Sequence, residues 1–429
     1  MKKIISAILC ILMIASLAVS AFADGPSGDV EIAMHFAPGS VQAEVFQEIV
    51  DAFMVDHPEI KVTVQYNGNE NMSKMKTRFA AGDAPDIIWT SPSDMLWYCQ
   101  SDLLAPVDDV FNGDNYDGTG KVCDDFKYQA VVDMNTVDGK LMALPVELCA
   151  GSWYYNKALY AELGLEIPKT WDEFVSNNAA LLEAGISPIA ADGNVDYYLP
   201  WYFTNLSVRL AGLDAYENAL LNKDSSVWDN PAFLKAAQLV AEGVTPYFQP
   251  GMKGTQYPAS NALFAQSIAA QVYCASWFPQ EIVSITPEDF EYGLFTFPEV
   301  DGAVETRQVV EMKANSYVLA KDAKNPEAAK VVLQYLVSKK GMEPLVKLDM
   351  LPAVKDIEVP EIQKEILGIF DSAEVGVPIH FYLFDPDYKD WASAVIFPAN
   401  NLLCYGEITP EDFIAKVKAD NDTYWAAKA

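Results

Sequence analysis

The chain has 429 residues and a formal net charge of −31 at pH 7, from 29 lysines and arginines and 60 aspartates and glutamates. So acidic a composition excludes nucleic acid and anionic lipid as expected partners, because both are bound by basic surfaces. The length predicts roughly two to three domain-sized units with large hydrophobic cores. A net charge far from zero also keeps a protein soluble and monomeric, so we expect a monomer.

Residues 1–23 have the pattern of a secretory signal peptide. Two lysines are followed by an apolar run to about Val19, and the small residues of Ala21-Phe22-Ala23 form a cleavage site before Asp24. The apolar run is short for a membrane span, and no other stretch of the sequence approaches that length. We therefore predict an exported protein with a cleaved leader, in a periplasm or at the cell surface.

The cysteines predict neither a lipid anchor nor a zinc site. A lipoprotein signal needs a cysteine directly after a small residue at the cleavage site, whereas Cys10 follows Leu9 within the apolar run. Without a lipid anchor, the protein would be kept near its membrane either by an outer membrane that confines it or by another route. The five later cysteines are scattered and form no C-x-x-C pair, so we expect buried thiols, with one disulfide as an alternative.

The first part of the mature chain alternates strands and helices. The predicted elements are a strand over 30–36, a helix from 40 to 56, a strand over 61–66, a helix over 71–81 and a strand over 87–89. The helices follow from apolar residues at helical spacing, and the strands from alternating or short apolar runs. This order begins a parallel, doubly wound sheet, which binds ligands beyond the carboxyl ends of its strands. Residues 35–36, 66–71 and 89–94 are therefore expected on the rim of a cleft.

The stretch from 139 to 174 carries the strongest local signals. An apolar run stopped by Pro145 and a β-rich run over 152–155 predict two short strands. A helix is expected over 157–163, ended by Gly164, and Thr170 with Glu173 forms a capping box for the next helix.

Later segments give fewer signals. The apolar stretch 269–274 predicts a strand that places Trp277 at its end. Helix starts are predicted at Asn325-Pro326-Glu327, with that helix closing near Gly341, and at Thr409-Pro410-Glu411.

The ordered set of motifs resembles the extracellular solute-binding proteins of ABC importers, in their carbohydrate-binding, maltose-binding-protein-like group. The resemblance rests on G-K-L-M-A-L-P, Y-N-K and T-W-D-E within residues 139–174, and on H-P-E-I-K-V and A-A-G-D-A-P-D-I before them. After them, residues 264–277 and Leu351-Pro352-Ala353 match two further family positions. The matches cover essentially the whole mature chain in the right order.

The resemblance implies an α/β, two-lobe fold of the type II periplasmic-binding-protein kind. Each lobe is expected to be a mostly parallel sheet flanked by helices, hinged around a central cleft. The first lobe would hold residues 24–147 and 298–350, and the second lobe residues 148–297 and 351–429, with chain crossings near residues 147, 297 and 350.

The implied function is capture of a mono- or oligosaccharide and its delivery to the membrane permease subunits of an ABC transporter. A ligand that touches both lobes binds the closed form better, so closure would be a shift of population by hinge motion. No covalent chemistry, cofactor or metal is expected.

Sugar binding needs flat aromatic faces for stacking and planar polar groups for paired hydroxyls. By the resemblance, Trp277 is the expected stacking platform; the alternative is a core or hinge tryptophan. Trp201 and Tyr198 match a second aromatic position of the family, with Asp196 at its acidic position. Core packing is the alternative for both of these aromatic side chains.

Further candidates lie in other predicted rim segments. Ser93 and Asp94 fall where the family places hydroxyl-binding groups, and Trp391 matches an aromatic position of the second lobe only loosely. The remaining candidates are Glu147 as a cleft carboxylate, His35, Glu70, Asn69 and Arg307. A lone histidine is more often structural than functional.

Enzyme motifs are missing from the sequence, which contains no G-x-S-x-G, H-E-x-x-H, P-loop or dinucleotide-binding G-x-G-x-x-G pattern. We therefore predict a binding protein and no enzyme. Two alternatives are kept. One is the same fold binding a polyamine, a metal chelate or a peptide. The other is a secreted glycan-active enzyme. A glycosidase needs two carboxyl groups at a set separation, and a sequence with 60 aspartates and glutamates does not exclude such a pair.

Overall fold

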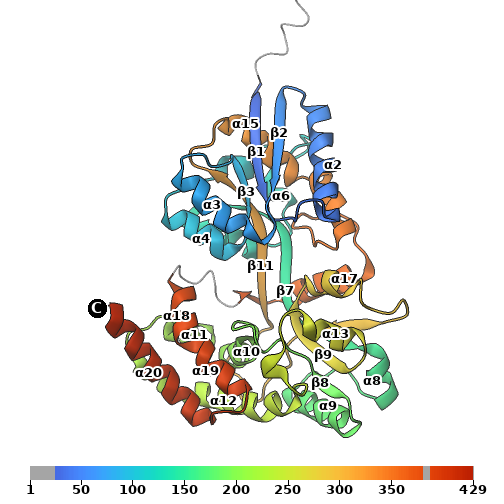
Figure 1. The fold of residues 1–429 in the computed structure, drawn as a ribbon, viewed down its shortest axis with the longest axis vertical. Coiled ribbons are helices and arrows are strands. Elements are labelled where there is room, and N and C mark those ends of the chain that lie inside the picture. The colour runs from blue at the N-terminus through green and yellow to red at the C-terminus, as the bar shows by residue number, and fades with distance from the viewer. Residues whose placement is uncertain (1–24, 380–386, 429) are drawn as a thin grey trace, which may run out of the picture.

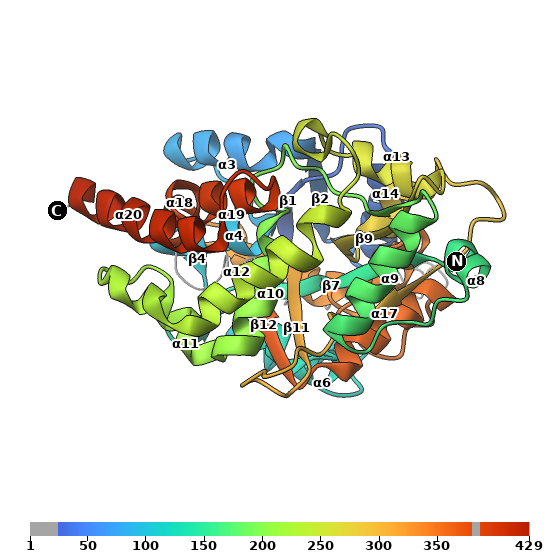
Figure 2. The same ribbon diagram turned by 90° about the horizontal axis from the view of Figure 1, so that it is seen from below.

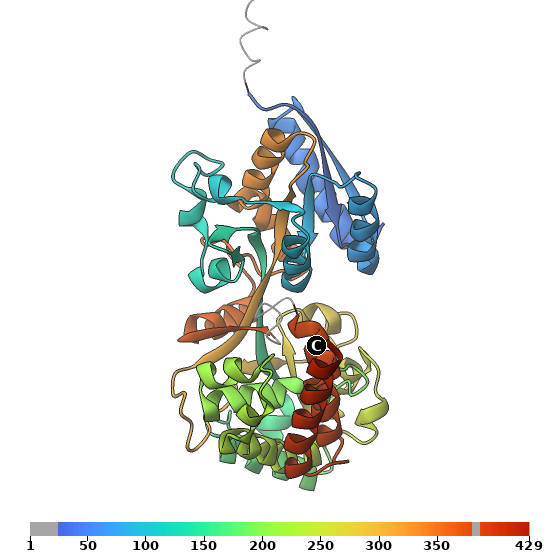
Figure 3. The ribbon, with the colours of Figure 1, turned by 90° about the vertical axis from the view of Figure 1, so that its left-hand side faces the viewer.

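The computed structural model describes residues 25–379 and 387–428, so the predicted signal peptide and His380 lie outside the described residues. Within the described segments, no helix is long and apolar enough to cross a membrane. The chain forms two lobes along the long axis of the molecule, which confirms the predicted α/β, two-lobe architecture (Figures 1 and 3). Two long strands, β7 (Leu144–Asn156) and β11 (Val309–Ala320), run from one lobe into the other.

The first lobe begins with the predicted alternation of strands and helices. Its elements are β1 (Gly28–Met34), α2 (Val41–Asp56), β2 (Ile60–Tyr66), α3 (Asn71–Ala80) and β3 (Ile87–Thr90). β1 pairs in parallel with both β2 and β3, as expected for a doubly wound sheet. The side chain of Ser40 caps α2 by accepting a hydrogen bond from the Ala43 N–H at 3.2 Å. The five predicted elements are therefore confirmed.

One sheet extends through both lobes in the strand order β2-β1-β3-β11-β7-β9-β8. β11 is antiparallel to β3 and to β7, so the two crossing strands form the centre of the sheet. The second lobe adds β8 (Ser187–Ile189), β9 (Ala269–Ala275), β10 (Tyr292–Phe295) and β12 (Val375–Pro378). β9 and β10 are antiparallel to β7, while β8 is parallel to β9 and β12 is parallel to β11.

The prediction of two short strands on either side of Pro145 is wrong. β7 is a single strand of 13 residues that passes through Pro145, and every one of its residues is buried. Pro145 lies opposite Ser316, where the register between β7 and β11 shifts. Proline has no backbone N–H to donate to a neighbouring strand. A sheet tolerates a proline near the end of a strand and at a shift of register, and Pro145 has both of these positions.

Helices cover the sheet in both lobes. They include α4 (Pro92–Gln100), α8 (Lys157–Leu163), α9 (Trp171–Glu183), α10 (Pro200–Ala211), α12 (Pro231–Gly243), α14 (Phe278–Ile282), α15 (Pro326–Leu336), α16 (Lys339–Met342), α17 (Glu361–Ser372), α18 (Tyr388–Ala394), α19 (Ile396–Cys404) and α20 (Pro410–Lys428). Seen from below, α9, α10 and α12 lie across the second lobe, with α20 at one end (Figure 2).

The sequence signals for helix ends are largely confirmed. Thr170 and Glu173 form the predicted capping box of α9, and α8 ends at Gly164, whose φ of 64° is the left-handed conformation that favours glycine. α15 and α20 begin at the predicted prolines. α15 ends at Leu336, before the predicted end near Gly341, and the short α16 follows it.

Each lobe has its own large hydrophobic core. The first core includes Phe46, Tyr317 and Tyr335, together with Ile366 and Phe370 of α17. The second core is rich in large aromatic side chains, among them Trp153, Trp201, Trp228 and Trp391. The lobe boundaries near residues 147, 297 and 350 would be defined by the segments that move together on closure. They stay a prediction.

A buried polar network ties β11 to the second lobe. On α10, Arg209 donates to the Asn205 side-chain oxygen at 3.0 Å, and Asn205 donates to Glu311 Oε2 on β11 at 2.7 Å. The Tyr273 hydroxyl on β9 donates to the same Glu311 oxygen at 3.3 Å. Arg209 and Glu311 are 4% and 1% exposed. Burial lowers the pKa of Arg209 to about 10, against the opposing effects of Tyr273 and Glu311, so the guanidinium is charged at neutral pH.

The cysteines of the described residues are free thiols, as expected. Cys149, Cys274 and Cys404 are buried, and Cys99 and Cys123 are half-buried. In the parts of the chain that the structure describes, no group of three or more histidine, cysteine, aspartate or glutamate side chains is placed to hold a metal ion.

Candidate functional site

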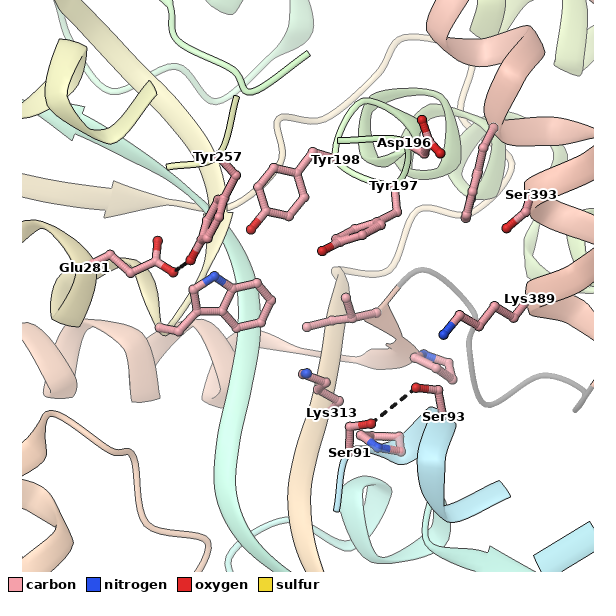
Figure 4. A pocket seen from close by; sticks show the side chains of 15 residues that line it. Ser91, Ser93, Asp196, Tyr197, Tyr198, Tyr257, Glu281, Lys313, Lys389 and Ser393 are labelled. Atoms are coloured by element: carbon pink, nitrogen blue, oxygen red, sulfur yellow. Dashed lines mark hydrogen bonds between the residues drawn. The ribbon is translucent and has the colours of Figure 1, made fainter. Parts of the chain in front are cut away.

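A cleft of 520 Å³ lies where side chains of the two lobes face each other (Figure 4). Ser91, Pro92 and Ser93 reach it from the first lobe, at the start of α4, and Lys313 reaches it from the crossing strand β11. The second lobe supplies the rest of the lining, which is Asp196, Tyr197, Tyr198, Tyr257, Trp277, Glu281, Pro378, Ile379, Lys389, Ser393 and Phe397. The volume and the mixture of aromatic and polar groups are those of a small-molecule site.

Aromatic side chains form one wall of the cleft. Trp277 stands just beyond β9, as predicted, and is half-buried with part of its indole facing the cleft. Tyr198 lines the same wall, and its ring stacks on Trp201 with the ring centres 5.3 Å apart. Trp201 is 1% exposed and lies behind the wall, 6.4 Å from the Trp277 ring centre. Two of the four predicted tryptophan and tyrosine side chains, Trp277 and Tyr198, thus line the cleft, and Trp201 supports them.

The predicted polar residues divide between the cleft and its surroundings. Ser93 and Asp196 line the cleft, whereas Asp94 is half-buried in the first turn of α4 outside the lining. Glu147 is buried in β7 and accepts a hydrogen bond from the Asn315 side chain at 2.8 Å. Burial raises the pKa of Glu147 more than the Asn315 bond and the Lys313 charge lower it.

The other predicted residues, His35, Glu70, Trp391, Asn69 and Arg307, also lie outside the cleft lining. His35 stacks on Trp89 with ring centres 3.4 Å apart, and burial lowers its pKa to about 3, so the imidazole is neutral. Glu70 is exposed and forms an ion pair with Lys74 at 3.1 Å. Trp391 is fully buried in the second core, where its indole N–H donates to Asn421 at 2.7 Å.

Several lining residues were not predicted from the sequence. Tyr257 and Glu281 come from separate segments of the second lobe, and Lys389 and Ser393 come from α18. No local motif marks them, because only the tertiary fold brings these segments together. Lys313 does have a sequence signal, because it is a lysine within the otherwise largely apolar stretch that forms β11.

Glu281 is held in place by two hydrogen-bond donors, and its pKa is raised well above the ordinary value. The Tyr257 hydroxyl donates to Oε1, and the Asn261 side chain donates to Oε2 at 2.8 Å. Burial, with a smaller contribution from the charge of Asp192, raises the pKa of Glu281 to about 8. The carboxyl is therefore largely protonated at neutral pH and can donate as well as accept hydrogen bonds.

The raised pKa of Glu281 predicts a pH dependence of stability. In the unfolded chain Glu281 loses its proton at its ordinary pKa of 4.5, whereas in the folded protein it keeps the proton up to about pH 8. Glu281 therefore lowers the free energy of unfolding as the pH rises from about 4.5 to 8. The slope is at most about 1.4 kcal/mol per pH unit. In Glu281→Gln we expect a smaller loss of unfolding free energy between pH 5.5 and 8, measured by urea denaturation.

The matched control for this prediction is Glu361→Gln, which removes an exposed carboxyl on α17. It should leave the pH dependence as in the unchanged protein. Equal pH dependences in all three proteins would show that Glu281 does not titrate as described.

Comparison with known proteins gives a consistent result. A family model described as "Bacterial extracellular solute-binding protein" matches residues 38–343. The diacetylchitobiose binding protein NgcE of Streptomyces coelicolor is 25% identical over 352 residues, which cover 78% of this chain and 74% of that protein. The multiple sugar-binding protein of Streptococcus mutans is 26% identical over 321 residues, which cover 72% of each chain.

A solved structure supports the fold independently. RafE from Streptococcus pneumoniae in its apo form superposes with a TM-score of 0.73 at 19% sequence identity, covering 94% of this chain and 99% of RafE. RafE has also been solved in complex with raffinose.

Proposed function

The chain belongs to the bacterial extracellular solute-binding proteins, and from this premise we propose that it captures a sugar or oligosaccharide and delivers it to an ABC transporter permease. The observation that carries the proposal is the cleft, where an aromatic wall with Trp277 faces hydroxyl groups of Ser91 and Ser93 from the other lobe. Indole and phenol faces suit the C–H faces of a pyranose ring, and the hydroxyl and carboxyl groups suit its hydroxyls.

The proposed mechanism is binding followed by closure. A solute that touches α4 of the first lobe and Trp277 of the second lobe gains contacts only when the lobes approach, so it favours the closed form. β7 and β11 join the two lobes and are the segments that would bend. The solute leaves unchanged, and no bond is made or broken. We further propose that residues 1–23 are removed on export and that the protein acts as a monomer without a lipid anchor.

A ligand screen tests the proposal. The mature protein is heated with a panel of mono- and oligosaccharides, and the compounds that raise Tm are then measured by calorimetry. A ligand present at a hundred times its Kd should stabilise the folded state by about 2.7 kcal/mol. Chromatography of the sugar after incubation should return it intact.

Other outcomes would contradict this function. Stabilisation by polyamines, metal chelates or peptides, with none by saccharides, would point to another solute. New reducing ends released from an oligosaccharide would point to an enzyme.

A further inference from the structure

The cleft contains two lysines on the side opposite the aromatic wall (Figure 4). Lys313 projects from the middle of β11, half-buried, with its ammonium 5.1 Å from the Trp277 ring centre. Lys389 projects from α18 and is exposed. Because Lys313 and Lys389 come from separate elements, only the tertiary fold brings both of them to the cleft.

Neither cleft lysine forms an ion pair with a carboxylate in the described part of the chain. This is notable in a chain with 60 acidic and only 29 basic side chains. On the outer surface, by contrast, Lys324 pairs with Asp83 at 3.1 Å and Lys330 pairs with Glu327 at 2.9 Å. A partly buried ammonium without a counter-ion carries a desolvation cost that a bound anion would offset.

The acidic groups near the cleft do not cancel these two charges. Glu281 is largely protonated at neutral pH, because burial raises its pKa to about 8, and its oxygens already accept from Tyr257 and Asn261. Asp196 is exposed on the aromatic side of the cleft. Asp94 lies in the first turn of α4, outside the cleft lining; burial raises its pKa, while a hydrogen bond with Ser91 and the charges of Lys389, Lys76 and Lys313 lower it.

We propose that the captured solute is a sugar carrying an acidic substituent, a carboxylate or a phosphate, which binds between Lys313 and Lys389 while the sugar ring stacks on Trp277. This inference rests on the proposed sugar-binding function and names the class of sugar. Lys313 lies over part of the Trp277 ring, so the sugar ring would stack on the indole surface that the ammonium leaves open and present its acidic group to that ammonium. Ammonium-to-anion hydrogen bonds are among the stronger polar contacts. The Ser91 and Ser93 hydroxyls hydrogen-bond to each other at 3.2 Å, which leaves one O–H of the pair to donate on the same side.

Calorimetry on the mature protein with matched ligands tests this inference. The probes are uronic acids and oligouronates, their methyl esters, the corresponding neutral sugars and their sugar phosphates. We expect an acidic member to bind at least about ten times more tightly than its ester or neutral counterpart. The carboxylate and phosphate arms of the panel identify which anion the site takes.

Two lysine variants and one control locate the anion. Lys313→Met and Lys389→Met should each weaken binding of the acidic ligand by roughly ten- to a hundredfold, while keeping the apolar stem. Lys364→Met removes an exposed lysine on α17, makes the same change in net charge and should leave affinity unchanged. Because Lys389 is exposed, its variant should fold even if Lys313→Met does not, and circular dichroism checks both.

The outcomes separate this inference from the proposed function. Tight binding of neutral sugars alone, with no effect of either lysine variant, would overturn the acidic-sugar inference and leave the sugar-binding function standing. Binding of no saccharide of any kind would overturn both.

Discussion

Replacing Trp277 with alanine is expected to weaken binding of the captured solute by roughly 2–4 kcal/mol, or about thirtyfold to a thousandfold in Kd. The half-buried indole stands just beyond β9 as part of the aromatic wall, and the Lys313 ammonium lies over its ring. Its removal takes away both the stacking surface and the ring that holds the lysine ammonium. The effect should be measured by calorimetry with a solute found in the ligand screen.

Trp425→Ala is a closely matched control for this prediction. Trp425 is also half-buried and also has a lysine ammonium, that of Lys223, 5.0 Å from its ring centre, but it lies on α20 away from the cleft lining. Its loss should leave Kd unchanged. Trp277→Phe should fall between the alanine variant and the unchanged protein, because a smaller ring keeps part of the stacking surface. An unchanged Kd in Trp277→Ala would mean that the solute binds elsewhere.

Replacing Glu311 with alanine should lower the free energy of unfolding by about 3–5 kcal/mol. Glu311 accepts hydrogen bonds from Asn205 and Tyr273 and supplies a carboxylate to the buried network around Arg209. Without it, the Arg209 guanidinium is left as an uncompensated charge in the second core. Urea denaturation at pH 7, followed by circular dichroism, measures the loss.

A second replacement tests the cause of that loss. Removing the guanidinium as well, in Glu311→Ala with Arg209→Met, should recover part of the stability, because no isolated buried charge then remains. Glu327→Ala, at an exposed ion pair on α15, should change the unfolding free energy by less than about 0.5 kcal/mol. Additive losses in the double variant would show that Arg209 and Glu311 act independently.

Much of the fold could be predicted because its signals are local. α2 was marked by Ser40 and by apolar spacing, and α9 by the Thr170 and Glu173 capping box. β11 was not predicted, because Glu311 and Lys313 interrupt its apolar pattern, and their surroundings come from distant segments. The single strand through Pro145 was missed for a related reason, since the register shift that accommodates the proline depends on the partner strand.

The cleft residues that could be predicted are those that follow a recognisable element or match a family motif. Trp277 follows a recognisable strand, and Tyr198 and Asp196 match an aromatic and an acidic position of the family before α10; all three line the cleft. Trp391 was predicted from a loose match to an aromatic position of the family, and it packs in the second core. Glu281 and Lys389 were missed because neither has a sequence neighbour that marks it, and their convergence depends on the packing of separate helices.

The central position of β11 makes the two lobes dependent on each other during synthesis. In the sheet, β11 separates β3 from β7, yet it is translated long after both of them. A nascent chain that ends before Val309 therefore lacks the strand on which the earlier ones must pair, and the first core also waits for α15 and α17. Such non-local pairing slows folding. A gene cut between the lobes would yield two incomplete fragments, each missing strands that only the other encodes.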